Sequence, residues 1–203
     1  RPGFPSLGSW VTYGLGSKST TLPPYVVLKD GLSTAGDVVF QHGMLPGRHR
    51  ASVANAERGK PPFPHLSPAQ QINRKDQYDN LKKLQQLNIA HQKKHVGQPE
   101  LISRIESFEM AFELQSSAIK TFDLNREPKS MHKLYGENLF SRHCLTARRL
   151  IESGVRFVEI LDGAEGRKWD AHGNRGGLID NHRNNAARTD QGITALITDL
   201  KSR

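Results

Sequence analysis

The feature that most constrains the fold is a helical segment that ends at a glycine and is followed by a short apolar strand, a pattern that occurs twice. In the first copy Leu7, Val11 and Leu15 are spaced by four, as on one side of a short helix, and Gly16 follows. After a polar turn comes YVVLKD at residues 25–30, a β-branched apolar run that indicates a buried strand.

The second copy lies in the last third of the chain. Its helical stripe has steps of four, three and four: Phe140, Cys144, Ala147 and Ile151. Gly154 then ends the helix, and VRFVEILD at residues 155–162 reads as another strand. Because helix, glycine and buried strand recur in the same order, the sequence predicts an α/β fold with a mostly parallel sheet flanked by helices.

Length and composition fit one domain. The 203 residues, 35% of them hydrophobic, suit a single core. The chain starts at Arg1 rather than methionine, and its last helical pattern still runs at Arg203, so we interpret residues 1–203 as one incomplete α/β domain. Residues 41–68 are rich in Gly, Pro, His and Arg without periodicity, which predicts a long irregular segment on the surface. No apolar run approaches the roughly 20 residues of a membrane-spanning helix.

Besides a short helix that ends at Tyr135 before Gly136, three further helices are predicted, each with an apolar side. One runs from about residue 68 to 95 and should pack by its leucines, and another starts at Pro99 with apolar residues directed at the core. The last runs from about 178 to beyond 201, with one expected core-facing stripe: Ala186, Asp190, Ile193, Ile197 and Leu200. Asp190 interrupts this stripe, so its carboxylate would need an ion pair, a hydrogen bond or a metal.

Charge and cysteine content narrow the possible functions. The net charge of +9 comes mostly from residues 48–94, which hold ten Lys or Arg and three acids. A basic region can bind nucleic acid or attract anionic substrates, but no nucleic-acid-binding motif accompanies it, so nucleic acid is not an expected partner. The single cysteine, Cys144, excludes an internal disulfide and is expected to be a buried, inert thiol.

Chemistry is expected after the second strand, because ligands of open parallel sheets bind beyond the carboxyl ends of the strands. The segment that follows reads DGAEGRKWDAHGNRGG. Asp170 and His172 are the candidate pair, since a carboxylate and an imidazole two residues apart in a loop can bind one cation. An Asx turn with a surface histidine explains the same residues without a metal.

Several stretches together resemble the bacterial sulfatase-like family labelled domain of unknown function 1501. They are PSLGSWVTYGLG, LPPYVVL, ESFEMAFELQ, DLNREP, LYG, FSRHCLTARRLIESGVRFVEI, WDAHGN and TDQGITALITDLKSR, in that order. The resemblance implies a partial alkaline-phosphatase-like fold and a metal-dependent hydrolase of phosphate or sulfate esters. By this resemblance Asp170 and His172 would bind a divalent zinc, manganese or calcium ion.

The resemblance also suggests roles around that pair. The side chains that could contact an anionic ester are Arg167, Lys168, Asn174 and Arg175. The three cations fit solvated loop charges equally well, and Asn174 also fits a turn. Asp162 and Asp190 could position the ligands. The family pattern has further metal ligands and the nucleophile outside this stretch, so residues 1–203 alone are expected to be inactive, and it implies a periplasmic or extracellular protein. The alternative is a catalytically inactive extracytoplasmic protein that binds anionic polymers through residues 48–94.

Overall fold

The computed structural model describes residues 3–30, 36–56, 59–63, 66, 72–95, 99–162, 169 and 177–203. Its helices are α1 (Leu7–Leu15), α2 (Arg74–Lys94), α3 (Pro99–Phe122), α4 (Lys129–Tyr135), α5 (Leu139–Glu152) and α6 (Gly177–Ser202). Its strands are β1 (Tyr25–Asp30), β2 (Ser52–Ala54) and β3 (Phe157–Asp162), and its short 3-10 helices are η1 (Gly36–Phe40), η2 (Gly47–His49) and η3 (Leu124–Arg126). No described helix is both long and apolar enough to cross a membrane.

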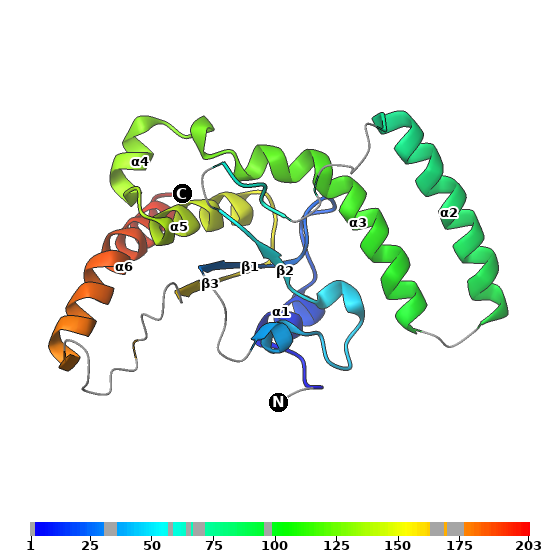
Figure 1. Cartoon of the computed structure of the whole chain (residues 1–203), viewed down its shortest axis with the longest axis horizontal. Coiled ribbons are helices and arrows are strands. Elements are labelled where there is room, and N and C mark those ends of the chain that lie inside the picture. The colour runs from blue at the N-terminus through cyan, green and yellow to red at the C-terminus, as the bar shows by residue number, and fades with distance from the viewer. Residues whose placement is uncertain are drawn as a thin grey trace.

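The three strands form one parallel sheet in the order β2-β1-β3. The α/β fold with a parallel sheet flanked by helices is therefore confirmed. In Figure 1 the carboxyl ends of β1 and β3 point toward the side of the molecule where α4 and the first half of α6 lie. This side is the carboxyl edge of the sheet.

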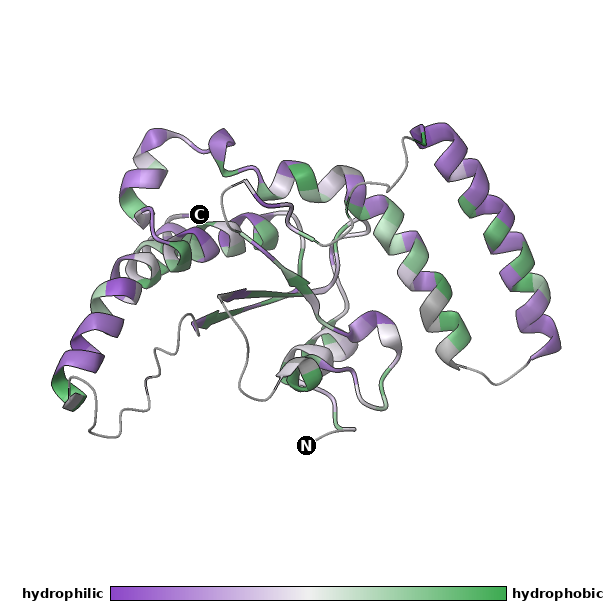
Figure 2. Ribbon diagram, in the orientation of Figure 1, coloured by the Kyte–Doolittle hydropathy of each residue, from purple (hydrophilic) through white to green (hydrophobic). Residues whose placement is uncertain are grey.

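The chief core lies between the sheet and the helices α3 and α5. Val26 and Leu28 of β1 are fully buried and pack with Leu150 of α5 and Ala118 of α3. Side chains alternate between the two faces of a strand, so these two β1 residues share one face. Green hydrophobic segments of β1, α3 and α5 meet there in Figure 2. The strand prediction for YVVLKD is thus confirmed, with a side chain buried on each face.

The opposite face of the sheet is covered by α1. Tyr25 of β1 and Phe157 of β3 stack edge to face on this side, with ring centroids 5.4 Å apart. Gly8 of α1 lies directly on them, because a Cβ added at Gly8 would come within 2.5–2.7 Å of both rings. The helix therefore contacts the sheet through its glycine and short polar residues, while Leu7 stays 70% exposed.

The apolar stripe predicted to face the core from α6 in fact faces solvent. Ile193, Ile197 and Asp190 are exposed, with Ile197 at 50%. The buried side of α6 consists of small and polar residues: Asn185, Thr189, Gly192, Ala195 and Asp199. A Cβ added at Gly192 would lie 3.1 Å from Cα of Ser141 in α5, so this close helix contact leaves no room for large side chains.

The helices α2 and α3 form an antiparallel hairpin that projects from the sheet (Figure 1). Tyr78 of α2 packs on Phe112 of α3 with ring centroids 5.7 Å apart, and Gln85 donates a hydrogen bond to Glu109. None of the residues of α2 is buried, so this helix is less packed than its leucines predicted. The apolar side of α3 is likewise only partly buried, since Phe108 is 45% exposed.

The segment predicted to be irregular, residues 41–68, differs from that expectation in two places. It contains η2 and the short edge strand β2, which pairs with β1 from Val26↔Ser52 to Leu28↔Ala54. Three residues are too few to produce a readable alternation in the sequence, so the strand is defined by pairing with β1 rather than by local pattern.

A buried ionic cluster joins α5 to α6 and to the chain before α4. The guanidinium of Arg148, only 4% exposed, pairs with Glu127, with Glu152 at 2.6 Å and with Asp199 at 3.3 Å. The hydroxyl of Tyr135 donates to Asp199 at 2.9 Å. Burial alone would raise the pKa of Glu127, but hydrogen bonds from Arg148 and Arg149 outweigh it and lower that pKa. The cluster thus keeps Glu127 ionised at neutral pH.

Cys144 should be unreactive in the folded protein. Its side chain is 1% exposed, and burial raises the pKa of the thiol to about 12. Since the thiolate is the nucleophile, we expect a thiol reagent at pH 8 to modify the native protein at least about 100-fold more slowly than the urea-unfolded protein. Absorbance at 412 nm with Ellman's reagent measures both rates. Equal rates would contradict the burial of Cys144.

Candidate functional site

Two neighbouring strands end on aspartate at the carboxyl edge of the sheet. In the parallel pairing of β1 with β3, Asp30 is in register with Asp162, and each is the last residue of its strand. The carboxyl edge is where open parallel sheets bind ligands, because the loops and helix N-termini that follow the strands converge there. Only the backbone of Asp30 is described, so the geometry of the site is built from Asp162.

Asp162 is held by an arginine from α6. Arg188 Nη2 donates to Asp162 Oδ2 at 2.7 Å, and Arg188 Nη1 donates to Oδ1, which makes the pair bidentate. The two side chains are 11% and 15% exposed, so the pair is largely removed from water. A bidentate guanidinium–carboxylate pair fixes both groups in one plane. The end of β3 is therefore tied to α6.

The indole of Trp169 binds the same carboxylate. Trp169 Nε1 donates to Asp162 Oδ2 at 3.1 Å, and the carbonyl of Trp169 accepts from His182 Nε2 at 2.8 Å. The rings of Trp169 and His182 also lie 5.9 Å apart. Trp169 directly precedes Asp170 in the sequence WDAHGN. The described contacts thus anchor the residue next to the predicted metal ligands at the end of β3.

These contacts define what Asp162 can do. Oδ2 already accepts two hydrogen bonds and Oδ1 accepts one, and the positive charge of Arg188 lies beside both oxygens. A cation that approaches this carboxylate would be repelled by the charge of Arg188 and would have to use the remaining lone pair of Oδ1. Asp162 therefore suits the role of a residue that positions its neighbours and not that of a metal ligand.

The other predicted site residues are only partly within the described structure. Asp170 and His172, together with the predicted ester contacts Arg167, Lys168, Asn174 and Arg175, lie outside the described residues. Asp190 is described and is exposed on α6, so it does not point into the core. Within the described ranges, no group of three or more His, Cys, Asp or Glu side chains is placed to hold a metal ion.

Three residues of the carboxyl edge were not predicted as site residues from the sequence: Asp30, Trp169 and Arg188. Both strand patterns, YVVLKD and VEILD, end on aspartate, and this repetition is the signal that could have identified Asp30. Trp169 was visible only as a neighbour of the predicted ligands. Arg188 has no recognisable motif, because it meets Asp162 from 26 residues away through the packing of α6.

A second polar cluster, beneath α1, pairs a histidine with a hydroxyl. His49 Nδ1 lies 3.1 Å from Thr12 Oγ1, which itself donates to the carbonyl of Ser9, so His49 is the donor. Burial, followed by the charge of Arg48, lowers the pKa of His49. Histidine–hydroxyl pairs can activate nucleophiles, but Thr12 is fully buried and out of reach of a substrate. This cluster instead holds α1 against η2.

Comparison with known proteins identifies a family and no characterised relative. A family model described as "Protein of unknown function (DUF1501)" matches residues 1–203. No curated protein and no solved structure matches the chain significantly.

Proposed function

Because the chain belongs to the DUF1501 family and has an organised carboxyl edge, we propose that it is part of a metal-dependent hydrolase of phosphate or sulfate esters. The resemblance to sulfatase-like proteins suggests this class, and by the same resemblance the protein would act in the periplasm or outside the cell. The observation that carries the proposal is the anchoring of Trp169 to Asp162, next in sequence to Asp170 and His172.

The donors available after Trp169 suit a divalent metal. Asp170 offers a carboxylate and His172 an imidazole, a combination that zinc and manganese accept, and calcium would use the oxygen donor. When bound, such an ion would act as a Lewis acid on an ester oxygen. The fit is supported by the hydrogen bond between Trp169 and Asp162, which holds the residue before Asp170 at the edge where the strands end.

The remaining residues of the edge would hold neighbouring side chains in place and balance the negative charge of an ester. Asp162 holds Arg188 and Trp169 in fixed positions, and the bidentate pair leaves the edge without a net charge from these two residues. Arg167, Lys168 and Arg175 would contribute positive charge for an anionic ester, and Asn174 could donate to one of its oxygens. Fixed donors stabilise developing charge at little reorganisation cost.

Metal binding by single-residue variants tests this proposal. Isothermal titration with manganese and zinc is expected to show a site in the wild-type protein whose affinity falls at least about tenfold in Asp170→Ala and in His172→Ala. Asp190→Ala is the matched control, because it removes an exposed carboxylate from α6. Unchanged affinity in both ligand variants would overturn the proposal.

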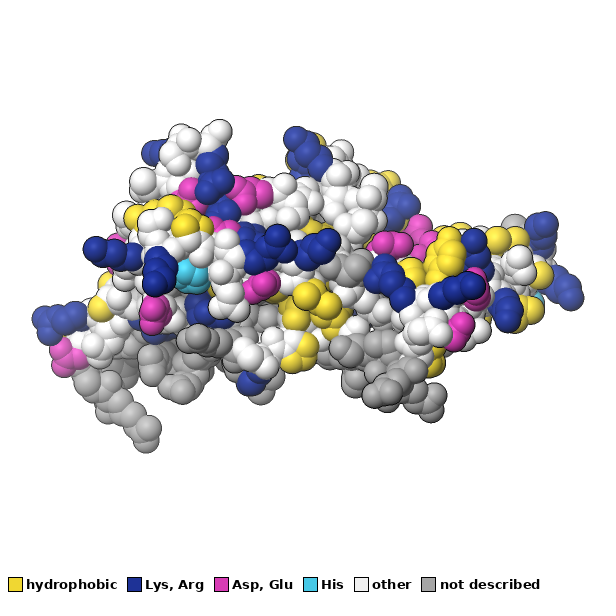
Figure 3. Space-filling model, turned by 90° about the horizontal axis from the view of Figure 1, so that it is seen from above, with side chains coloured by type: hydrophobic (Ala, Val, Ile, Leu, Met, Phe, Trp, Pro, Cys, Tyr) yellow, Lys and Arg dark blue, Asp and Glu magenta, His cyan; other side chains and the backbone are white. Residues whose placement is uncertain are grey.

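A second candidate function rests on the solvent exposure of α2. This helix carries six cations, none of them buried: Arg74, Lys75, Lys82, Lys83, Lys93 and Lys94. Figure 3 shows Lys and Arg side chains around the projecting hairpin, with hydrophobic side chains between them. Such a surface could bind an anionic polymer. Heparin affinity that falls steeply with rising salt and is insensitive to chelators would favour this function, and weak, salt-independent binding would exclude it.

A further inference from the structure

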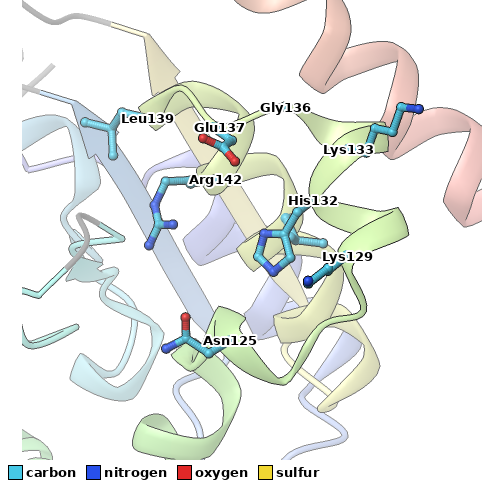
Figure 4. A pocket seen from close by; sticks show the side chains of 9 residues that line it. Asn125, Lys129, His132, Lys133, Gly136, Glu137, Leu139 and Arg142 are labelled. Atoms are coloured by element: carbon cyan, nitrogen blue, oxygen red, sulfur yellow. The ribbon is translucent and has the colours of Figure 1, made fainter.

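A cavity of about 870 Å³ lies between η3, α4 and the start of α5, and neither Asp162 nor Arg188 is among its lining residues. Among its lining residues are Asn125, Lys129, His132, Glu137 and Arg142. Figure 4 shows the side chains of Asn125, Lys129, His132 and Arg142 around one space, with Glu137 at its upper end. Lys133 also lines the cavity, but its side chain points away in this view.

The donors of this cavity are oriented before any ligand arrives. Arg142 Nε donates to the carbonyl of Ala56 at 3.2 Å, which fixes the plane of the guanidinium. His132 Nε2 lies 3.0 Å from the carbonyl of Leu124 and donates to it. Groups that are already held in place lose less conformational entropy when they bind a ligand. Arg142 is therefore anchored beside the cavity, and the N–H of His132 that donates to Leu124 holds that ring in place. Lys129 is a second cation at the cavity.

The charge of the cavity favours an anion. Among the described lining residues Lys129, Lys133 and Arg142 are positive, and Glu137 is the acid. A guanidinium beside an ammonium and an amide offers several N–H donors to one compact ligand, the arrangement that suits the oxygens of phosphate or sulfate. A smaller hollow of about 210 Å³ shares Asn125 and Arg142 with the cavity and adds Lys60, beyond the end of β2.

We propose that this cavity binds a phosphate or sulfate group, either as the free oxyanion or as part of a small ester. The site uses none of the residues of the proposed metal centre, and it goes beyond the proposed function. A ligand bound there would contact Arg142 and Lys129 through its anionic oxygens, and the remainder of an ester could extend toward the hollow beside Lys60.

Titration with defined anions tests the site. We expect inorganic phosphate and sulfate to bind the wild-type protein saturably in isothermal titration at constant ionic strength, and a phosphate monoester to compete with them. Lys129→Gln is expected to weaken binding about tenfold or more, since a charge-assisted contact is lost. Arg142→Gln should weaken binding to a similar extent. Lys129→Gln is less able to disturb folding, because Lys129 is exposed.

The controls separate this site from other sources of binding. Arg183→Gln removes an exposed arginine of α6 and should leave anion affinity unchanged. Asp170→Ala and EDTA should also have no effect, so failure of the metal proposal would leave this one intact. Competition by the monoester would show that the site accepts esters, and binding of the inorganic ions alone would show a site for the free anion. Absence of saturable binding in the wild type, or equal affinity in Lys129→Gln, would overturn the proposal.

Discussion

Replacing Arg148 with alanine is expected to lower the free energy of unfolding by about 3–5 kcal/mol, because it leaves buried carboxylates without their counter-charge. Arg148 is 4% exposed, and its partners Glu127 and Asp199 are 8% and 5% exposed. Urea unfolding followed by circular dichroism measures the change. Since this cluster ties α5 to α6, its loss should also reduce the cooperativity of the transition.

An exposed pair provides the matched control. Arg183 and Asp180 form an ion pair on α6 with side chains 71% and 60% exposed. Arg183→Ala is expected to change stability by less than about 1 kcal/mol. If Arg148→Ala changed the free energy of unfolding as little as this control does, the buried cluster would not stabilise the fold.

The same cluster predicts how stability depends on pH. The pKa of Asp199 is lowered because hydrogen bonds from Arg203 and Tyr135 outweigh the effect of burial, and the pKa of Glu127 is lowered as described above. Acids with lowered pKa values stabilise the fold above the pKa of the unfolded state and lose this contribution as the pH falls through the folded-state value. The wild type should therefore lose stability below about pH 4.5. The free energy of unfolding of Arg148→Ala should fall less over the same pH range, because this variant lacks the charge that lowers the pKa of Glu127.

Asp162→Ala is expected to lower the free energy of unfolding by about 3 kcal/mol and to release Trp169. The substitution leaves Arg188 largely buried without its partner and removes the acceptor of the indole N–H. In a Trp10→Phe background Trp169 is the sole tryptophan. Its emission should shift to the red and become more sensitive to acrylamide when Asp162 is replaced.

Asp180→Ala in the same background is the control, because it removes an exposed carboxylate from the start of α6. It should leave the emission and quenching of Trp169 unchanged. If Asp162→Ala leaves them unchanged as well, Trp169 is not held at the end of β3 in solution.

The sequence predicts the fold class here because its main signals are local. The alternation of YVVLKD and its β-branched residues define a buried strand before any partner is known. Gly16 and Gly154 have positive φ, +66° and +91°, and each ends a helix shortly before a strand, as the pattern required. Two units of this kind favour a parallel sheet, because a helix lets the chain run back along the sheet and start the next strand in the same direction.

The side of α6 that faces the core could not be predicted from periodicity. Ile193 and Ile197 mark the apolar side of the helix, yet the contact with α5 is made through Gly192 and Thr189. Close helix packing selects small residues, and hydropathy patterns give these little weight. For the same reason Asp190 looked like a core carboxylate when it is exposed.

The candidate site was half predictable. Asp162 ends a recognisable strand, so the carboxyl edge and the WDAHGN segment could be located from the sequence. The partners of Asp162 could not, because Arg188 and Trp169 reach it through tertiary packing that no local pattern encodes. The cavity between η3, α4 and α5 could not be predicted from the sequence for a similar reason, since its lining residues come from three separate elements.

Crystals of the protein soaked in manganese or zinc, with anomalous diffraction recorded at the absorption edge of the metal, test the central claim most directly. We expect an anomalous peak at the carboxyl edge beside Trp169, about 2.0–2.2 Å from donor atoms of Asp170 and His172. His91 near the end of α2 and His95 just after it, whose ring centroids lie 4.0 Å apart, offer a competing surface site. A peak at that pair alone, with Asp170 and His172 directed away from any metal, would contradict the account.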